Sequence, residues 1–182
     1  MGRVFPCSIG RGGIVPARDK REGDGATPDG VHRFVGMLYR PDRLSAAELP
    51  DWALPFGPSD LWSDDSRDPD YNLMVRAPHD FSHENLRRAD PMYDLILITD
   101  WNWPQSVPGR GSAIFVHSWR RPHARTAGCV ASARTFGLQV STIDNVDFVP
   151  VRITQVRAVV ANAIARAMTR CAFVAATVRD AS

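Results

Sequence analysis

A chain of 182 residues fits one domain with a buried core, and 44% hydrophobic against 23% charged residues is the balance of an ordinary globular protein. A net charge of +2 is too small to favour nucleic acid as a partner. Three cysteines exclude a disulfide framework. No stretch has the length of a membrane-spanning helix, and the N-terminal residues show no secretory signal peptide, so we expect no stable membrane span.

The first half of the chain reads as short strands separated by loops. Loosely alternating apolar residues predict short strands with a tight turn within residues 3–15, and the charged, glycine-rich stretch Lys20–Gly30 predicts a loop. Residues 41–70 are dense in Pro, Asp and Ser, which predicts a long irregular segment of a kind that is usually functional. Three aromatic residues are expected to fix this segment to the core: Trp52, Trp62 and Tyr71.

The middle of the chain alternates between apolar runs and turns. Ser82–Asn85 reads as the N-cap of a short helix that runs to Arg88. Leu95–Thr99 and Ala113–His117 are apolar runs that predict strands. Between them, Trp101–Pro108 predicts a turn, whose two tryptophans fit the rim of a glycan or peptide groove and equally fit simple loop packing.

The C-terminal part differs in pattern from the rest. Leu138–Ser141 and Val146–Ile153 read as strands. Val156–Val178 is rich in alanine, with apolar residues along one side, and predicts an amphipathic helix. Five arginines and no acid fall between Val151 and Arg179. A basic amphipathic helix can lie on an anionic membrane, but we favour a helix docked on its own domain.

The segment Gly111–Val130 carries the chemistry. It consists of an apolar run ending in His117, a polar loop, and Thr-Ala-Gly-Cys ending in Cys129. A free thiol is mostly protonated at neutral pH and needs a base to become a nucleophile, and a histidine at the end of a strand can be that base. Gly128 leaves room for backbone N–H groups to approach a carbonyl under attack.

Two other interpretations of these residues stay open. Cys129 can be a small buried residue and His117 an ordinary strand-end residue bound to a backbone carbonyl. Alternatively, His117, His123 and Cys129 can be three zinc ligands. Their spacing is not a common zinc pattern and no second cysteine lies nearby, so we expect no metal site.

The motif resembles the catalytic motif of the L,D-transpeptidase family, in which a histidine is followed by a loop and Ser/Thr-x-Gly-Cys. The matching residues are His117, Thr126, Gly128 and Cys129. The likeness extends upstream through KREGDGATPDGVHRF, LYRPDR, WSDDSRDPDYN, SHENLRRADPMYDLILITDWN and GRGSAIFVH, in the order of one bacterial branch of the family. It covers about 120 residues, from near Gly10 to Val130, and fades abruptly afterwards.

The resemblance implies a mainly β fold, a sandwich-like or barrel-like catalytic domain with short helices, to which the sequence adds the C-terminal amphipathic helix. In the family, a segment like Thr27–Gly30 leads into a strand, here Val31–Leu38. We therefore divide the chain into a catalytic domain over residues 1–150 and an atypical helical tail over residues 151–182.

The resemblance also implies a reaction. Cys129, as a thiolate paired with the imidazolium of His117, attacks a peptidoglycan stem peptide, and D-Ala leaves from the resulting thioester; an amine then forms a 3→3 cross-link. Gly128 and Cys129 supply the oxyanion donors, and the carbonyl of Ser118 orients the base. No metal or organic cofactor is implied, and the partners are peptidoglycan stem peptides.

Three residues are assigned to substrate binding beside Ser118. Thr126 is expected to shape the groove, and Glu84 and Asn72 lie in two of the matching upstream blocks. The arginines of the intervening loop can meet stem carboxylates or simply be solvated.

Alternatives to cross-linking remain. Water in place of the amine gives an L,D-carboxypeptidase, which in the cytoplasm would trim recycled stem peptides, and the absence of a visible signal peptide favours that role. The atypical tail favours a degenerate, non-catalytic peptidoglycan-binding domain. The family points to the cell envelope or periplasm. The oligomeric state is not indicated by the sequence.

Overall fold

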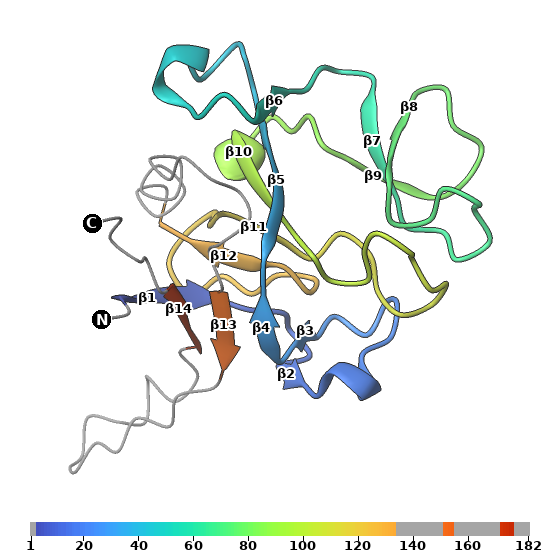
Figure 1. Cartoon of the computed structure of the whole chain (residues 1–182), viewed down its shortest axis with the longest axis vertical. Coiled ribbons are helices and arrows are strands. Elements are labelled where there is room, and N and C mark those ends of the chain that lie inside the picture. Colours follow the sequence, from blue (N-terminus) through green and yellow to red (C-terminus); the bar gives the residue numbers. More distant parts are fainter. Residues whose placement is uncertain (1–2, 134–150, 155–171, 177–182) are drawn as a thin grey trace.

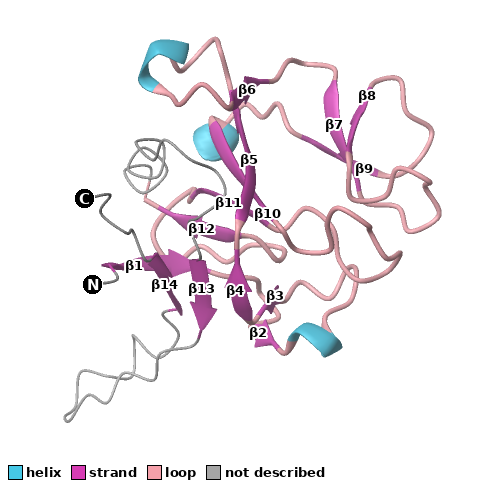
Figure 2. Cartoon of the chain, viewed as in Figure 1, coloured by secondary structure: helices cyan, strands magenta, loops and turns pink. Residues whose placement is uncertain are grey.

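The computed structural model describes residues 3–133, 151–154 and 172–176, and these form a mainly β fold with three single-turn 3₁₀ helices (Figures 1 and 2). The large sheet has the strand order β4-β13-β14-β1-β12-β11-β10-β5-β6. Its strands in chain order are β1 (Arg3–Ser8), β4 (Gly30–His32), β5 (Phe34–Tyr39), β6 (Ala53–Pro55), β10 (Leu95–Thr99), β11 (Phe115–Ser118), β12 (Val130–Ser132), β13 (Val151–Thr154) and β14 (Ala172–Ala176).

Two smaller sheets and the 3₁₀ helices complete the described elements. The three-stranded sheet has the order β8-β7-β9, and β2 pairs with β3. The bounds are β2 (Ile14–Val15), β3 (Thr27–Pro28), β7 (Asp60–Ser63), β8 (Met74–Arg76) and β9 (His83–Asn85), with 3₁₀ helices η1 (Ala17–Asp19), η2 (Ala46–Glu48) and η3 (Pro91–Tyr93).

The large sheet curves back on itself. Its strands β4 and β5 are separated in the chain by Arg33 alone, yet β4 stands at one end of the strand order and β5 next to the other end. One residue spans only about 3.5 Å, so the two ends of the sheet must approach each other. This closure gives the barrel-like shape in which β4 lies close to β5 in Figure 1.

The core has two parts, one on each face of the central strands. Because successive side chains of a strand point to opposite faces, Leu95 and Leu97 of β10 enter one cluster while Ile96 enters the other. The second cluster also holds Cys129 and an edge-to-face pair of Trp62 and Phe115, whose ring centroids are 4.9 Å apart. This pair fastens the small sheet to β11.

Most of the predicted strands are confirmed. The strand Leu95–Thr99 is β10, the predicted strand over Val31–Leu38 is divided into β4 and β5, and Ala113–His117 overlaps β11. The irregular segment 41–70 contains β6 and β7. Of its three expected anchors, Trp62 and Tyr71 are buried and Trp52 packs against the first cluster.

The predicted short helix that begins at Ser82 is wrong. His83–Asn85 is strand β9, whose Glu84 pairs with Trp62 of β7. The N-cap pattern is a local signal, and pairing with β7 overrides it because the neighbouring strand supplies the backbone partners.

The C-terminal prediction also needs correction. Ala172–Ala176 is strand β14, which pairs antiparallel with β1 and β13, so the amphipathic helix proposed for Val156–Val178 does not extend over these residues. The other residues of that helix, like the predicted strand Leu138–Ser141, lie outside the described residues. The predicted strand Val146–Ile153 overlaps β13 at residues 151–153. Because β13 pairs with β4, residues on both sides of the proposed boundary at 150 share one sheet.

Candidate active site

His117 and Cys129 lie on one face of two neighbouring strands. Strand β11 runs parallel to β12, with His117 opposite Ala131. Cys129 stands two residues before Ala131, and side chains two positions apart in a strand share a face. Cys129 is therefore a diagonal neighbour of His117, and both side chains line one cavity of about 530 Å³.

The turn before Cys129 is held by two threonine hydroxyls. The hydroxyl of Thr126 accepts a hydrogen bond from the N–H of Gly128 (3.2 Å) and donates one to the carbonyl of Cys129 (2.6 Å). From the other side, the hydroxyl of Thr27 donates to the carbonyl of Gly128 (2.7 Å). Thr126 lines the cavity, but both functions of its hydroxyl are used within the turn.

Gly128 has to be a glycine. Its φ is +151°, and an added Cβ would lie 3.2 Å from the carbonyl oxygen of Ala26 and 3.3 Å from Cδ1 of Ile114. A side chain would therefore meet both backbone strain and a packed neighbour on each side. The sequence prediction that Gly128 lets backbone N–H groups approach a carbonyl under attack stays a prediction.

The thiol of Cys129 is held by a hydrogen bond to the backbone. Its Sγ donates to the carbonyl of Ala113 (3.0 Å), and Ala113 has a positive φ of 51°. The amide oxygen of Asn72 accepts from the N–H of Ala113 (2.9 Å) and from Nε1 of Trp62 (3.0 Å). Asn72 therefore fixes Ala113, whose carbonyl accepts the hydrogen bond of the Cys129 thiol.

Asn72 was predicted to bind substrate, and the structure gives it a different place. It is buried, it is not among the residues that line the cavity, and its amide nitrogen donates to the carbonyls of Trp101 and Asn102. With donors and acceptor engaged, no part of the amide is left for a ligand.

The imidazole of His117 is fixed in one tautomer. Its Nδ1 lies 2.8 Å from the carbonyl oxygen of Ser118. A carbonyl oxygen only accepts, so Nδ1 carries the proton and Nε2 is the basic nitrogen. The ring of Tyr93 meets the imidazole edge-on, with centroids 4.9 Å apart.

Burial makes the resting pair neutral. Removal from water raises the pKa of the Cys129 thiol to about 12, and the charge of Glu84 acts in the same direction. Burial also lowers the pKa of His117 to about 4. At neutral pH the proton therefore rests on sulphur.

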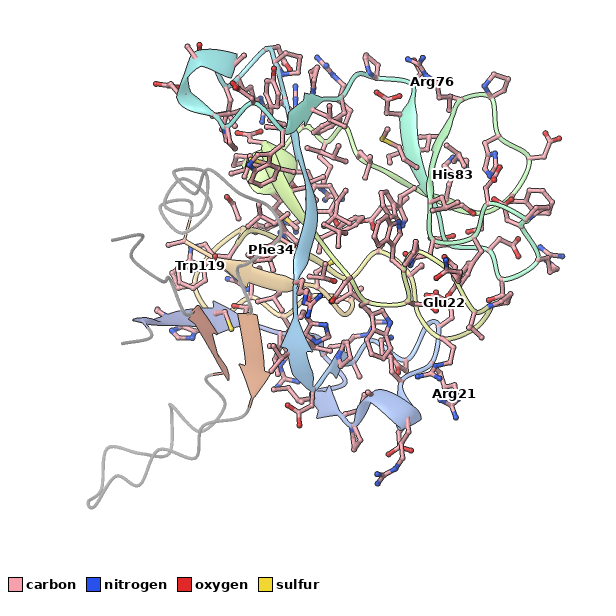
Figure 3. The ribbon with its side chains drawn as sticks, in the orientation of Figure 1. Arg21, Glu22, Phe34, Arg76, His83 and Trp119 are labelled. Carbon is pink, nitrogen blue, oxygen red and sulfur yellow. The ribbon has the colours of Figure 1, made fainter. Side chains whose placement is uncertain are left out.

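Glu84 lies on the wall of the same cavity. Its carboxylate accepts a hydrogen bond from the hydroxyl of Tyr93 (2.6 Å). Burial raises the pKa of Glu84, although the hydrogen bond and the charge of Arg88 oppose this shift. Figure 3 labels His83, the neighbour of Glu84 in β9, on the small sheet.

Charged groups surround the cavity. Lys20 is 2% exposed, and its ammonium donates to the carbonyl of Arg21 and to Asp24 (2.6 Å). Glu22, labelled in Figure 3, accepts a hydrogen bond from Tyr71. Other charged residues of the lining are Arg11, Asp64, Arg88, Arg120 and Arg125. Charges of both signs therefore line the cavity.

The tryptophan turn does not form a rim of this cavity. Trp101 and Trp103 are not among the lining residues, and Nε1 of Trp101 donates to the carbonyl of Arg110 (3.1 Å). The zinc interpretation finds no support either. Among the described residues, which include His117, His123 and Cys129, no three metal-ligating side chains gather.

Sequence reasoning missed Tyr93 and Lys20. Both lie in blocks that carry the family resemblance, RADPMYD and KREGDG. Neither tyrosine nor lysine has a spacing rule that ties it to the Cys–His motif, so only the folded arrangement shows that both border the cavity.

A buried thiol and a single-tautomer imidazole, side by side at a cavity, define a cysteine–histidine site suited to acyl transfer. The family confirms the class: the chain belongs to the L,D-transpeptidase catalytic-domain family, whose YkuD family model matches residues 2–135. Proteins of this family are cysteine-dependent peptidoglycan transpeptidases. No curated protein and no solved structure matches the chain. In the part that the structure describes, no helix is long and apolar enough to cross a membrane.

Proposed function

We propose that this protein is an L,D-transpeptidase that cleaves the terminal D-Ala from a peptidoglycan stem tetrapeptide and transfers the remaining acyl group to an amine, forming a 3→3 cross-link. The observation that carries the proposal is the pairing of Cys129 with His117 on one cavity wall, with Nδ1 of His117 held by the Ser118 carbonyl. That contact leaves Nε2 as the base.

The first half-reaction forms a thioester. As the sulphur of Cys129 attacks the carbonyl of the third stem residue, its proton passes to Nε2 of His117. A concerted transfer suits a resting pair that is neutral, because neither ion has to accumulate in the buried site. The imidazolium then protonates the leaving amine of D-Ala.

The oxyanion of the tetrahedral intermediate needs backbone donors. The N–H of Gly128 already donates to the hydroxyl of Thr126. We therefore assign the oxyanion chiefly to the N–H of Cys129, with Gly128 as the residue whose missing side chain lets the carbonyl approach. Thr126 shapes the turn that presents this donor rather than binding the stem itself.

The second half-reaction decides between cross-linking and trimming. An amine of another stem attacks the thioester and restores the thiol, with Nε2 of His117 accepting the proton of the amine. Water in that place gives carboxypeptidase activity. Proteins of the matched family are peptidoglycan transpeptidases, which is why we place cross-linking first.

Incubation of the purified protein with a disaccharide-tetrapeptide tests the proposal. We expect release of D-Ala and a dimeric product by mass spectrometry, and loss of both in Cys129→Ala. Cys7→Ala is the matched control, because Cys7 is buried in the other core cluster and should leave turnover intact. A tripeptide without dimer would replace the transpeptidase by the carboxypeptidase. No turnover by folded protein would support a non-catalytic domain.

A further inference from the structure

Tyr93 lines the cavity together with Glu84, His117 and Cys129. It ends the 3₁₀ helix η3, whose first turn is capped by the side chain of Asp90, and it is 4% exposed. Its ring packs edge-on against His117 and Phe115, with centroids 4.9 and 6.4 Å away. Its hydroxyl donates to Glu84. The Tyr93 side chain is thus held by three neighbours, which restricts where its hydroxyl can lie.

Tyr93 also belongs to the same core cluster as Cys129, and both residues line the same cavity. Burial raises the pKa of the Cys129 thiol and the charge of Glu84 raises it further, whereas the nearby Tyr93 hydroxyl and the charge of Lys20 lower it. The imidazole of His117 shares that face of the sheet. The pKa of Tyr93 itself is raised by burial and by the neighbouring anions, so the phenol keeps its proton.

We propose that the Tyr93 hydroxyl is a donor shared between two acceptors, the Glu84 carboxylate in the resting site and the Cys129 sulphur once the thiol has lost its proton. During this step the S–H bond of Cys129 breaks and its proton goes to Nε2 of His117. Tyr93 keeps its own proton and changes only the acceptor. The inference rests on the proposed role of Cys129 as nucleophile.

The arrangement makes Glu84 and Tyr93 act on Cys129 in opposite directions. Glu84 opposes the thiolate through its charge and also holds the hydroxyl that would stabilise the thiolate. When the hydroxyl turns away, the carboxylate keeps the attraction of Arg88 and the repulsion of Asp64. Formation of the thiolate is thereby linked to the charge state of a carboxylate on the cavity wall.

The experiment measures alkylation of Cys129 by iodoacetamide across pH, with the Cys129 peptide quantified by mass spectrometry. Glu84→Gln removes the charge but keeps an acceptor for Tyr93, so we expect faster alkylation at pH 8. Tyr93→Phe removes the hydroxyl but keeps the ring contacts, so we expect slower alkylation. At a pH below the pKa of Cys129, a shift of one unit in that pKa changes the alkylation rate about tenfold.

Opposite shifts in the two variants would support the shared donor. If the substitutions merely loosen the structure, the Cys129 thiol becomes more exposed and alkylation becomes faster in both variants. That result would overturn the proposal, and so would an unchanged alkylation rate in both variants. Tyr39→Phe, which removes a buried hydroxyl on the other face of the sheet, should leave the rate within about twofold of the wild type. If Tyr93→Phe does not fold, 3-fluorotyrosine at position 93, a stronger donor of nearly the same shape, must accelerate alkylation. Alkylation needs no stem peptide, so its outcome is separate from that of the turnover assay.

Discussion

At the scale of single residues, the site is defined by which hydrogen-bonding groups are already engaged. The order of residue types indicated Cys129 and His117, and the family resemblance added the Ser118 carbonyl. The structure places Nδ1 of the imidazole against that carbonyl. Asn72 and Thr126 were expected to meet substrate, but their polar atoms are used within the protein. A motif indicates which residues matter; only the hydrogen-bond partners show whether each contacts a ligand or supports one that does.

Thr126 offers a test of this distinction. Thr126→Val keeps the shape and removes both hydrogen bonds of the turn, so we expect a loss of about 1–3 kcal/mol in the free energy of unfolding. We also expect kcat to fall more than KM rises, because the turn presents the nucleophile. Urea titration and the D-Ala release assay measure the two effects. Thr126→Ser, which keeps the hydroxyl, should recover most of both; a rise confined to KM would instead return Thr126 to substrate binding.

Gly128 gives a second prediction at this scale. In Gly128→Ala the new Cβ meets Ala26 and Ile114 at a positive φ, and strain of this kind costs about 1–3 kcal/mol. We expect a lower midpoint of thermal unfolding and a loss of D-Ala release greater than tenfold. Gly13→Ala is the matched control, because Gly13 also has a positive φ but an added Cβ there meets nothing within 4 Å. Equal turnover in the two variants would show that close approach at Gly128 is unimportant.

At the scale of elements, apolar alternation predicted those strands whose formation is already indicated by the local sequence pattern. The run LILIT is both the predicted strand and β10, because it lies between β5 and β11 and each face meets a core cluster. Two segments with helix-like patterns form strands instead, namely His83–Asn85 and Ala172–Ala176. Their partners, β7 for the first and β1 and β13 for the second, lie far away in sequence, which a local pattern does not register.

The C-terminal strand β14 provides the test for elements. It lies between β13 and β1, so Val174 pairs on both sides, with Ile153 and with Phe5. Val174→Pro removes a backbone donor from the middle of the sheet, and we expect destabilisation of about 3 kcal/mol or more. Val174→Thr keeps the donor and the branched side chain and serves as the control. A proline variant with the thermal stability of the wild type would mean that β14 does not pair with β1 and β13 in solution.

At the scale of the whole molecule, the buried site makes stability depend on pH. The pKa of His117 is about 4 in the folded protein against 6.5 for an exposed histidine. The unfolded chain therefore binds a proton first as the pH falls, so the stability that His117 contributes is complete above pH 6.5 and is lost down to about pH 4. The full loss is about 3 kcal/mol.

Thermal unfolding at a series of pH values measures this dependence. We expect the wild type to lose stability between pH 6.5 and pH 4, and His117→Gln to lose much less over that range. His123→Gln, at an exposed loop position, should follow the wild type. Asp90 acts in a separate range, because the Arg88 guanidinium holds the pKa of Asp90 at about 2, and its contribution is lost only below about pH 4. The same slope in wild type and His117→Gln would mean that the imidazole is not buried in its neutral form.

The central claim is that Cys129 carries the acyl group, and the most direct measurement is the mass of the protein quenched in acid during reaction with a disaccharide-tetrapeptide. We predict an adduct equal to the donor minus D-Ala, located on the peptide that contains Cys129 and removed by hydroxylamine as a thioester should be. Cys129→Ala should show no adduct. An adduct on another residue, or D-Ala released by the Cys129→Ala variant at the wild-type rate, would contradict the account.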